Sequence, residues 1–454
     1  MIGPFMYQWL RGSRWVVGSG AALLFFLAIA LHGSQAASAA TITVTNTNDT
    51  ITAGDGVSLR EAVQSVGQGS NFSDVVATGA YGTNDTIFFN LPAGQVIVLT
   101  NGTLVLARDV TINGPGASAL AVDGGCTANC GTSSAVGGVT VFQVNSGVTV
   151  TGVTANLSGL TIRNGKGKQG GGIYNLGTLT VTNAALSGNS ANIGGGYVGG
   201  GGGIYNDGTL TVTNSTLSGN SGGDGGGIYN SNYFYTSYYP GGGTLTVTNS
   251  TLSGNSAVYG GGGGIYNDFS GYIVGPVTVT NSTLSGNDAV DGGGIYNAGS
   301  TVTLINAIVA NSPTGGDLAG TFGGGNNLID DTSGASGTLT GSRNITGKPA
   351  LLAPLGNYGG PTETIALLPG SPAIDAGDDT VCAATGPGTV NNLDQRGVAR
   401  PVGRTATLAP SSRKDSPSPP ALATRSRSRS AAPSPPSASP SHRTTPATRS
   451  AAAR

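Results

Sequence analysis

Residues 201–220 carry the phrase that decides the fold: Gly-Gly-Gly-Ile-Tyr-Asn-Asp-Gly-Thr-Leu-Thr-Val-Thr-Asn-Ser-Thr-Leu-Ser-Gly-Asn. Its first six residues occur five times, at residues 170–175, 201–206, 225–230, 262–267 and 292–297. A variant of the remaining part follows each time. Within this part, leucine and valine alternate with threonine, which gives one apolar and one polar face and indicates a β-strand.

Each unit is too short to bury a core of its own. If the units stack in register, equivalent apolar residues lie on one another and form continuous columns. The expected pairs are Ile204 on Ile228, Leu210 on Leu245 and Leu217 on Leu252. The repeats therefore predict a solenoid.

Asparagines mark the corners of this solenoid. In three units, the asparagine that ends Ile-Tyr-Asn is followed 14 residues later by another: Asn175 by Asn189, Asn206 by Asn220, and Asn297 by Asn311. Asn adopts the left-handed backbone that a corner needs, and stacked amides can bond along an axis with a rise of about 4.8 Å. We therefore expect an all-β fold, a single-stranded parallel β-helix, which the crossover rule makes right-handed. In the other two units the interval is 25 and 20 residues, which indicates insertions at the same corner.

The chain of 454 residues begins with the features of a secretory signal peptide. Arg11 and Arg14 precede an apolar run at residues 15–31, and small residues at 36–40 offer a cleavage site. We expect residues 1–40 to be removed on export and the protein to be secreted or held at the cell surface; an uncleaved signal anchor is the alternative. No later stretch is long and apolar enough to span a bilayer.

A short helix is expected before the repeats. Ser58-Leu59-Arg60-Glu61 matches a helix capping box, and Gly67 is the expected end of the helix. Such a helix would cover the first coil, which otherwise exposes an unpaired strand edge and an apolar end. We therefore place an N-terminal cap and the first coils at residues 41–140, and the repeats at residues 141–349.

Three motifs carry a family resemblance. Residues 57–62 resemble the "CSLREA" motif of exported bacterial β-helix proteins, with Val57 in place of the cysteine. The repeats resemble those of chlamydial polymorphic outer-membrane proteins, within the pectin-lyase-like right-handed β-helix fold. Segments similar to the choice-of-anchor Q domain lie at residues 355–362, 370–378 and 394–397. The resemblance implies a secreted or surface-attached bacterial protein with a C-terminal cap at residues 350–403.

Residues 404–454 differ from the rest of the chain in composition. They contain nine basic residues, one acidic residue and no aromatic residue, and they are rich in serine and proline, so we expect a disordered tail. One choice of codons for residues 404–412, read in a shifted frame, encodes the cysteine-containing segment with which similar proteins usually close. Our hypothesis is that this tail arises from a frameshift, and that the lost cysteine was the partner of Cys382. Cys126 and Cys130 are candidates for a second, local disulfide.

The composition narrows the possible chemistry. Residues 41–403 contain no histidine, which excludes histidine-dependent triads and histidine-containing metal sites there. Residues 170–341 contain no Lys or Arg, so the repeats cannot supply the basic residue that polysaccharide lyases of similar fold typically use.

Paired carboxylates are the remaining catalytic candidates. Asp207 and Asp268 each follow Ile-Tyr-Asn, whereas Asp224 and Asp291 each precede a glycine run. With one unit per coil, Asp207 and Asp268 lie two coils apart, about 10 Å, near the upper limit for an inverting glycosidase. The alternatives are solvated corner aspartates and calcium ligands, although the sequence has no calcium-binding repeat or EF-hand loop. No other metal or cofactor is expected.

The two insertions are rich in aromatic residues. They leave the same corner of successive coils, so they would form neighbouring loops that stack on sugar rings or bind a partner, unless they fold back on the solenoid. Their aromatic residues are Tyr233, Phe234, Tyr235, Tyr238 and Tyr239 in the first insertion, and Phe269 and Tyr272 in the second.

We therefore expect a monomeric extracellular protein, adhesive or structural, that binds a polysaccharide or a cell-surface partner through these loops. The alternative is a carbohydrate-active enzyme, a glycoside hydrolase or polysaccharide lyase, and a spacer that binds nothing is a third reading. Nucleic acid is not an expected partner, because residues 41–403 carry 9 basic and 20 acidic residues in an exported chain.

Overall fold

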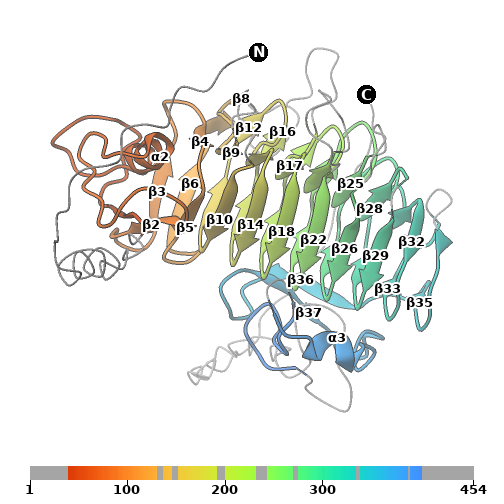
Figure 1. Cartoon of the computed structure of the whole chain (residues 1–454). Helices are drawn as coiled ribbons and strands as arrows, with labels where there is room; N and C mark the ends of the chain where they lie inside the picture. The colour runs from red at the N-terminus through yellow and green to blue at the C-terminus, as the bar shows by residue number, and fades with distance from the viewer. Residues whose placement is uncertain are drawn as a thin grey trace, which may run out of the picture. The chain divides into compact units, whose positions relative to one another are not determined.

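The computed structural model describes residues 39–129, 136–145, 152–191, 200–231, 243–268, 275–299, 301–333, 338–386 and 389–400. The predicted all-β parallel β-helix is confirmed, because the strands of successive repeats stack in long parallel sheets (Figure 1). The predicted signal peptide, apart from its last two residues, and the tail at residues 404–454 lie outside the described residues. No described helix is long and apolar enough to cross a membrane.

Each repeat forms one coil with a strand in each of three long sheets, and the repeats that begin at residues 170, 201 and 225 have a short fourth strand. One coil passes through β17 (Ile204–Asn206), β18 (Thr209–Thr213), β19 (Thr216–Ser218) and β20 (Ser221–Gly222) before β21 (Ile228–Asn230) begins the next. Equivalent strands pair in parallel from coil to coil. We name the three long sheets after the repeat residues that characterise them: the threonine sheet, the serine sheet and the tyrosine sheet.

The strands of each sheet follow in spatial order. The threonine sheet contains β1 (Thr41–Val44), β2 (Asp85–Phe89), β5 (Val110–Asn113), β10 (Thr154–Ser158), β14 (Thr178–Thr182), β18, β22 (Thr244–Thr248), β26 (Val277–Thr280), β29 (Val302–Ile305), β32 (Thr321–Gly323) and β34 (Thr338–Leu339). The serine sheet contains β3 (Gln95–Val98), β6 (Leu120–Asp123), β11 (Thr161–Arg163), β15 (Ala185–Ser187), β19, β23 (Thr251–Ser253), β27 (Thr283–Ser285), β30 (Ile308–Ala310), β33 (Leu328–Ile329) and β35 (Ile345–Thr346). The tyrosine sheet contains β4 (Leu104–Leu106), β9 (Phe142–Val144), β13 (Ile173–Asn175), β17, β21, β25 (Ile265–Asn267), β28 (Ile295–Asn297) and β31 (Leu318–Ala319). A short fourth sheet contains β12 (Lys166–Gly167), β16 (Ser190–Ala191), β20 and β24 (Ser256–Ala257), and β7 (Cys126–Ala128) pairs antiparallel with β8 (Val136–Gly137).

The register of these sheets places like residues on like, as the repeats predict. The paired residues are Ile204 with Ile228, Leu210 with Leu245, and Leu217 with Leu252. All six side chains are fully buried. Burying one such aliphatic side chain contributes roughly 1.5–3 kcal/mol, so the stacked columns supply the core that no single coil could form.

Two columns of buried asparagines run through the coils. In both, Nδ2 of one asparagine donates to Oδ1 of the equivalent asparagine in the next coil, at 2.7–3.0 Å. The first column is Asn175, Asn206, Asn230, Asn267 and Asn297, and the second is Asn189, Asn220, Asn255 and Asn287. The predicted amide stacking is therefore confirmed.

The left-handed corner belongs to a different set of asparagines. Of the six asparagines expected to be left-handed, only Asn311 is, with a φ of 59°. The corner between the threonine and serine sheets is turned instead by Asn183, Asn214, Asn249, Asn281 and Asn306, with φ between 48° and 54°. The backbone prediction was wrong because it assigned two tasks to one residue: the stacked asparagines aim their amides along the axis, and a separate asparagine, six to eight residues away in sequence at Asn183, turns the chain.

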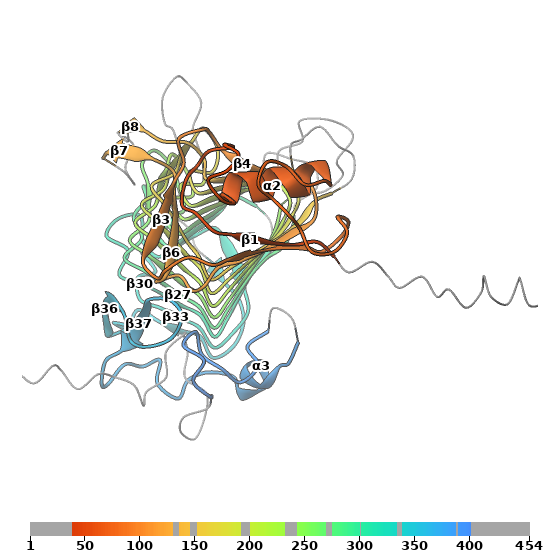
Figure 2. The same ribbon diagram turned by 90° about the vertical axis from the view of Figure 1, so that its left-hand side faces the viewer.

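Helix α2 (Leu59–Gln68) lies across the first coils (Figure 2). Its capping box is complete, because Ser58 Oγ accepts from Glu61 N and Ser58 N donates to Glu61 Oε2, at 3.2 and 2.9 Å. Its apolar face is buried in the core of the solenoid. The helix extends past Gly67, the predicted end, and is capped by Gly69, which has a φ of 70°. Without a Cβ, Gly69 takes this conformation at little cost.

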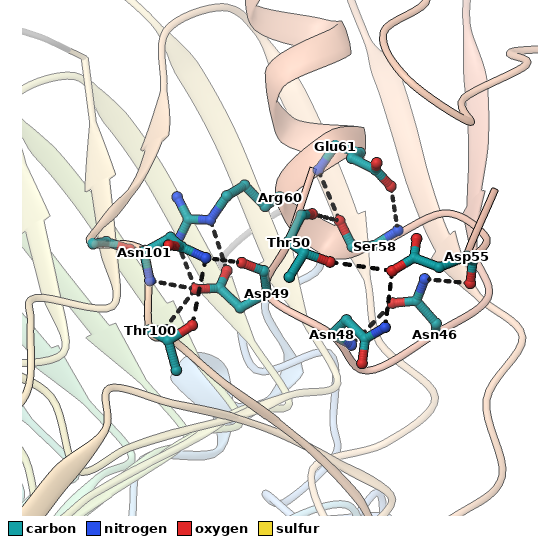
Figure 3. A network of polar contacts seen from close by, with 11 residues as sticks. Asn46, Asn48, Asp49, Thr50, Asp55, Ser58, Arg60, Glu61, Thr100 and Asn101 are labelled. Atoms are coloured by element: carbon teal, nitrogen blue, oxygen red, sulfur yellow. Dashed lines mark hydrogen bonds and ion pairs between the residues drawn. The ribbon is translucent and has the colours of Figure 1, made fainter. Parts of the chain in front are cut away.

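Arg60, which lies between Ser58 and Glu61 of the capping box, holds helix α2 to the neighbouring chain (Figure 3). It forms an ion pair with buried Asp49, in which Nε and Oδ1 are 2.7 Å apart, and it donates to Gly102 O at 2.5 Å. Asp49 Oδ2 also accepts from the backbone N–H groups of Thr100 and Asn101, at 2.6 and 2.8 Å. These bonds join the chain before α2 to the chain that enters β4, so this motif has a structural role.

The C-terminal segment, residues 350–386 and 389–400, lies along the flank of the coils (Figure 1). It contains the antiparallel strands β36 (Leu352–Gly356) and β37 (Thr364–Leu367), and helix α3 (Asp379–Ala383). Apolar residues of the segment pack on the outside of β30 and β33.

Hydrogen bonds hold this segment at the corner between the threonine and serine sheets. Gln395 Nε2 donates to Thr216 Oγ1 at 2.9 Å, and Gln395 Oε1 accepts from Thr251 Oγ1 at 2.7 Å. Further along the solenoid, Asn306 Oδ1 accepts from Asp378 N at 2.8 Å. The polar groups that recur at this corner, coil after coil, provide the partners that the segment needs.

Candidate functional site

The tyrosine of each Ile-Tyr-Asn unit points outward, because alternate residues of a strand face opposite sides of a sheet. The five rings form a ladder along the tyrosine sheet: Tyr174, Tyr205, Tyr229, Tyr266 and Tyr296. Centroids of the last four rings are 4.9–5.1 Å apart with interplanar angles of 5–13°, whereas Tyr174 meets Tyr205 edge-on at 80°. Since the stacked faces cover one another, the ladder presents ring edges and phenol hydroxyls outward.

One edge of this tyrosine ladder carries Asp207, Ser231 and Asp268 in three successive coils. The backbone N–H of each donates to the asparagine carbonyl one coil earlier, at 2.8, 2.8 and 3.0 Å, so the three residues occupy equivalent positions. Asp207 and Asp268 are therefore two coils apart, as predicted, which corresponds to about 10 Å. Ser231 stands between them.

Side-chain hydrogen bonds connect this edge to the rings. Tyr205 Oη donates to Ser231 Oγ at 3.0 Å, and Tyr229 Oη donates to Asp268 Oδ2 at 2.9 Å. Burial raises the pKa of Asp207 to about 7, against the opposing effect of a hydrogen bond from Ser231. Burial also raises the pKa of Tyr205 and Tyr229 above the ordinary value of a phenol. Asp207 thus exchanges a proton close to neutral pH.

The opposite edge carries Asp224 and Asp291, each before a glycine run. Asp224 Oδ1 accepts from Gly261 N at 3.0 Å, and burial raises the pKa of this carboxyl, with a further contribution from the charge of Asp268. Asp291 pairs with Gly261 one coil earlier. The four predicted aspartates therefore gather along the two edges of one ladder and do not form a single compact cluster.

Glycine is required where a ring covers the backbone. A Cβ on Gly200 would lie 2.5 Å from Tyr229 Cδ2, and one on Gly261 would lie 2.4 Å from Tyr296 Cγ. Real side chains do not approach so closely. These two glycines, each directly before a Gly-Gly-Gly run, therefore leave the space that the rings of the ladder occupy.

We call the ladder and its four aspartates the acidic tyrosine face. Residues 170–341 provide no Lys or Arg to neutralise it, so its carboxylates favour ligands with hydroxyl or ammonium donors. Within the described ranges, no three His, Cys, Asp or Glu side chains come together as a metal site would require. The calcium alternative thus gains no support from this face.

The predicted aromatic residues of the insertions, Tyr233 to Tyr239, Phe269 and Tyr272, lie outside the described residues. Their attachment points are described: Gly243 N donates to Ser231 O at 2.8 Å, which closes the base of the first insertion beside the ladder. Asp268 stands directly before residues 269–274. Sequence reasoning missed the ladder itself, although the tyrosine that recurs between Ile and Asn was its signal.

The cysteines differ in state. Cys126 is disulfide-bonded, and Cys130, its predicted partner, lies outside the described residues, so the identity of the partner stays a prediction. Cys382 is a free, buried thiol whose Sγ accepts from Asn281 Nδ2 at 3.4 Å. Its hypothetical partner would follow residue 403, beyond the described part.

Neither the protein-family models nor the curated proteins with which the chain was compared match it. The parallel β-helix therefore rests on the structure, and the closer resemblance drawn from the N-terminal and C-terminal motifs stays a prediction.

Proposed function

We propose that this is a secreted or cell-surface protein that binds a glycan or a surface partner through its acidic tyrosine face and the insertions beside it. One observation carries the proposal: Asp207, Ser231 and Asp268 stand in three successive coils along a stacked tyrosine ladder, at the corner from which both insertions start. A spacer that binds nothing would not need acidic groups buried beside aromatic rings.

The chemistry of this face suits sugars with free hydroxyl or amino groups. Carboxylates and phenol oxygens accept from such donors, and charge-assisted hydrogen bonds are the strong ones. The ladder offers only ring edges, so stacking on sugar rings falls to the aromatic residues of the insertions. In this proposal the ladder is a rigid base and the insertions supply the contact area.

A retention assay tests the proposal. The purified protein is incubated with insoluble and acidic polysaccharides, and bound protein and released sugar ends are measured in the same tubes. The Tyr235→Ala/Tyr238→Ala variant should lose retention, whereas Tyr358→Ala on the C-terminal segment should keep it. Equal retention of both variants would show that the insertions are not part of the binding surface.

The second candidate is a glycoside hydrolase. It is favoured by the pKa of Asp207, which at about 7 is that of a general acid at neutral pH, with the carboxylate of Asp268 two coils away. Steady release of sugar ends that is abolished by both Asp207→Asn and Asp268→Asn would support it. Retention without product would leave the binding proposal standing alone.

A further inference from the structure

A groove of about 540 Å³ lies between the outer face of the threonine sheet and the C-terminal segment. One wall is formed by threonines of β14, β18 and β22, and the other by Thr389, Asn391, Leu393 and Asp394. This groove is on a different sheet from the acidic tyrosine face, and neither the repeats nor the motifs of the sequence indicated it.

The threonine wall is a regular array. Thr180, Thr211 and Thr246 pair in register across three successive coils, and a second row, Thr182 and Thr213, runs beside them. Hydroxyls therefore repeat at about 4.8 Å along the solenoid axis and about 6.7 Å along each strand. None of these five hydroxyls bonds to another group in the described part of the chain, in contrast to Thr216 and Thr251, which hold the C-terminal segment.

Two residues of the groove lining also carry a buried acceptor. Asn214 and Asn249 line the groove, and the Oδ1 atom of each is buried without a hydrogen-bond partner among the described residues. Asn249 is 2% exposed, and its Nδ2 donates a hydrogen bond to Leu393 O at 2.8 Å. The Oδ1 atom of Asn281, the equivalent residue one coil further along, is buried and unpaired as well but lies outside the groove lining, so these acceptors are a property of this corner that the groove shares.

The groove carries no free charge of either sign. Asp394 is the charged residue in its lining, and it is neutralised by Arg396, whose Nη2 lies 2.5 Å from Asp394 Oδ2. The backbone N–H groups of Arg396 and Val398 also donate to Asp394, at 2.9 and 3.0 Å. An acidic polysaccharide or a nucleic acid would find no cation here, whereas hydroxyls, amides and threonine methyls match the alternating polar and apolar surface of a neutral sugar.

We propose that this groove binds an extended, neutral oligosaccharide whose chain runs along the solenoid axis, with about one sugar unit for each coil. The hydroxyl groups of the sugar exchange hydrogen bonds with the threonine array. The apolar edge of the sugar ring lies against the threonine methyls and Leu393. The proposal is independent of the acidic tyrosine face and holds whether or not the insertions bind.

Calorimetric titration of the full-length protein tests the groove. The probes are the neutral hexasaccharides of β-1,4- and β-1,3-linked glucose, with hexagalacturonate as the acidic comparison. The Thr180→Val/Thr211→Val/Thr246→Val variant removes three hydroxyls and keeps β-branched side chains of the same shape. Its matched control is Thr278→Val/Thr303→Val, on the outer face of the same sheet but outside the groove.

At least one neutral hexasaccharide should bind, and the triple variant should raise its Kd about tenfold or more, while the control changes it less than about twofold. A second variant, Leu393→Trp, fills the groove without touching the hydroxyls and should abolish binding. Failure of both neutral probes, tighter binding of hexagalacturonate, or triple and Leu393→Trp variants that bind like the unmodified protein would each overturn the proposal. Circular dichroism melting checks that all variants fold.

Discussion

The asparagine column through Asn220 makes a quantitative prediction about stability. Asn220 is fully buried, and its Nδ2 donates to Leu186 O at 3.0 Å and to Asn255 Oδ1 at 2.9 Å. Its Oδ1 accepts from N and Nδ2 of Asn189, at 3.0 and 2.9 Å. Asn220→Ala removes all four bonds in the middle of the solenoid.

The cost follows from the groups left behind. Asn189 loses the acceptor of its backbone N–H and of one amide hydrogen, and Leu186 O loses a donor. A buried polar group without a partner costs about 1–3 kcal/mol, and the vacated space adds a cavity term. For three such groups, each near the lower end of that range, we expect the free energy of unfolding to fall by about 3–5 kcal/mol. The total free energy of unfolding of a whole domain is only about 5–15 kcal/mol.

Urea unfolding followed by far-UV circular dichroism measures this loss, with Asn90→Ala as the control, because Asn90 is exposed and lies outside both columns. Hydrogen exchange adds a local readout: the backbone amide of Asn189 should exchange faster in the variant. A loss below about 1 kcal/mol, or equal losses in Asn220→Ala and Asn90→Ala, would refute the view that the columns hold the coils together.

Three further predictions concern the edge of the ladder and the cap. Because burial raises the pKa of Asp207 to about 7, the folded state binds the carboxyl proton of Asp207 more tightly than the unfolded chain does. The contribution of this proton to folding stability is complete below about pH 4 and is lost as the pH rises to about 7. Asp207→Asn should therefore remove up to about 4 kcal/mol of that pH dependence and raise the Tm at pH 8. Arg60→Ala leaves Asp49 buried without its ion-pair partner and should lower the free energy of unfolding by about 3 kcal/mol in urea, with only partial rescue by Arg60→Lys, which cannot bond through two nitrogens. Gly200→Ala should displace the ring of Tyr229 and change the near-UV circular dichroism of the tyrosines, whereas Gly82→Ala, which has open space around it, should not.

Each of these predictions has a result that would contradict it. For Asp207, it is an unchanged stability profile between pH 4 and 8 in the variant. For the cap, it is an Arg60→Ala variant that unfolds at the same urea concentration as the parent. For the ladder, it is a Gly200→Ala variant whose tyrosine spectrum matches that of Gly82→Ala.

The repeats made most of the coil geometry predictable. Strand positions, register and apolar columns follow from identical residues at identical intervals, so the pairing of Ile204 with Ile228 follows from the repeat spacing alone. The capping box at Ser58 and Glu61 was equally local, since both partners lie within one helical turn. The end of α2 was less predictable, because Gly67 and Gly69 are both acceptable stops and only packing decides between them.

Long-range polar contacts were not predictable in this way. Gln395 bonds to Thr216, from which it is separated by 179 residues, and no periodicity links the two. The groove at the threonine sheet exists only because the C-terminal segment lies there, so a threonine pattern typical of an ordinary strand surface gave no sign of it. The role of Tyr229 was hidden for a related reason: a residue on the outer face of a strand becomes half-buried only when the next coil stacks on it.

The position of the C-terminal segment also sets the order in which this molecule can be completed. In a plain solenoid each coil touches only its neighbours, so either end can unravel without disturbing the rest. Here residues 350–400 bond to coils that lie 72 to 180 residues earlier, through Asn306, Ser215 and residues between them. Those coils are synthesised well before the segment that fastens them. A chain that stops short of residue 350 would therefore leave this corner of the coils uncovered, with its polar groups deprived of the partners that residues 350–400 provide, and we expect proteases to cut it there more readily than the full-length chain.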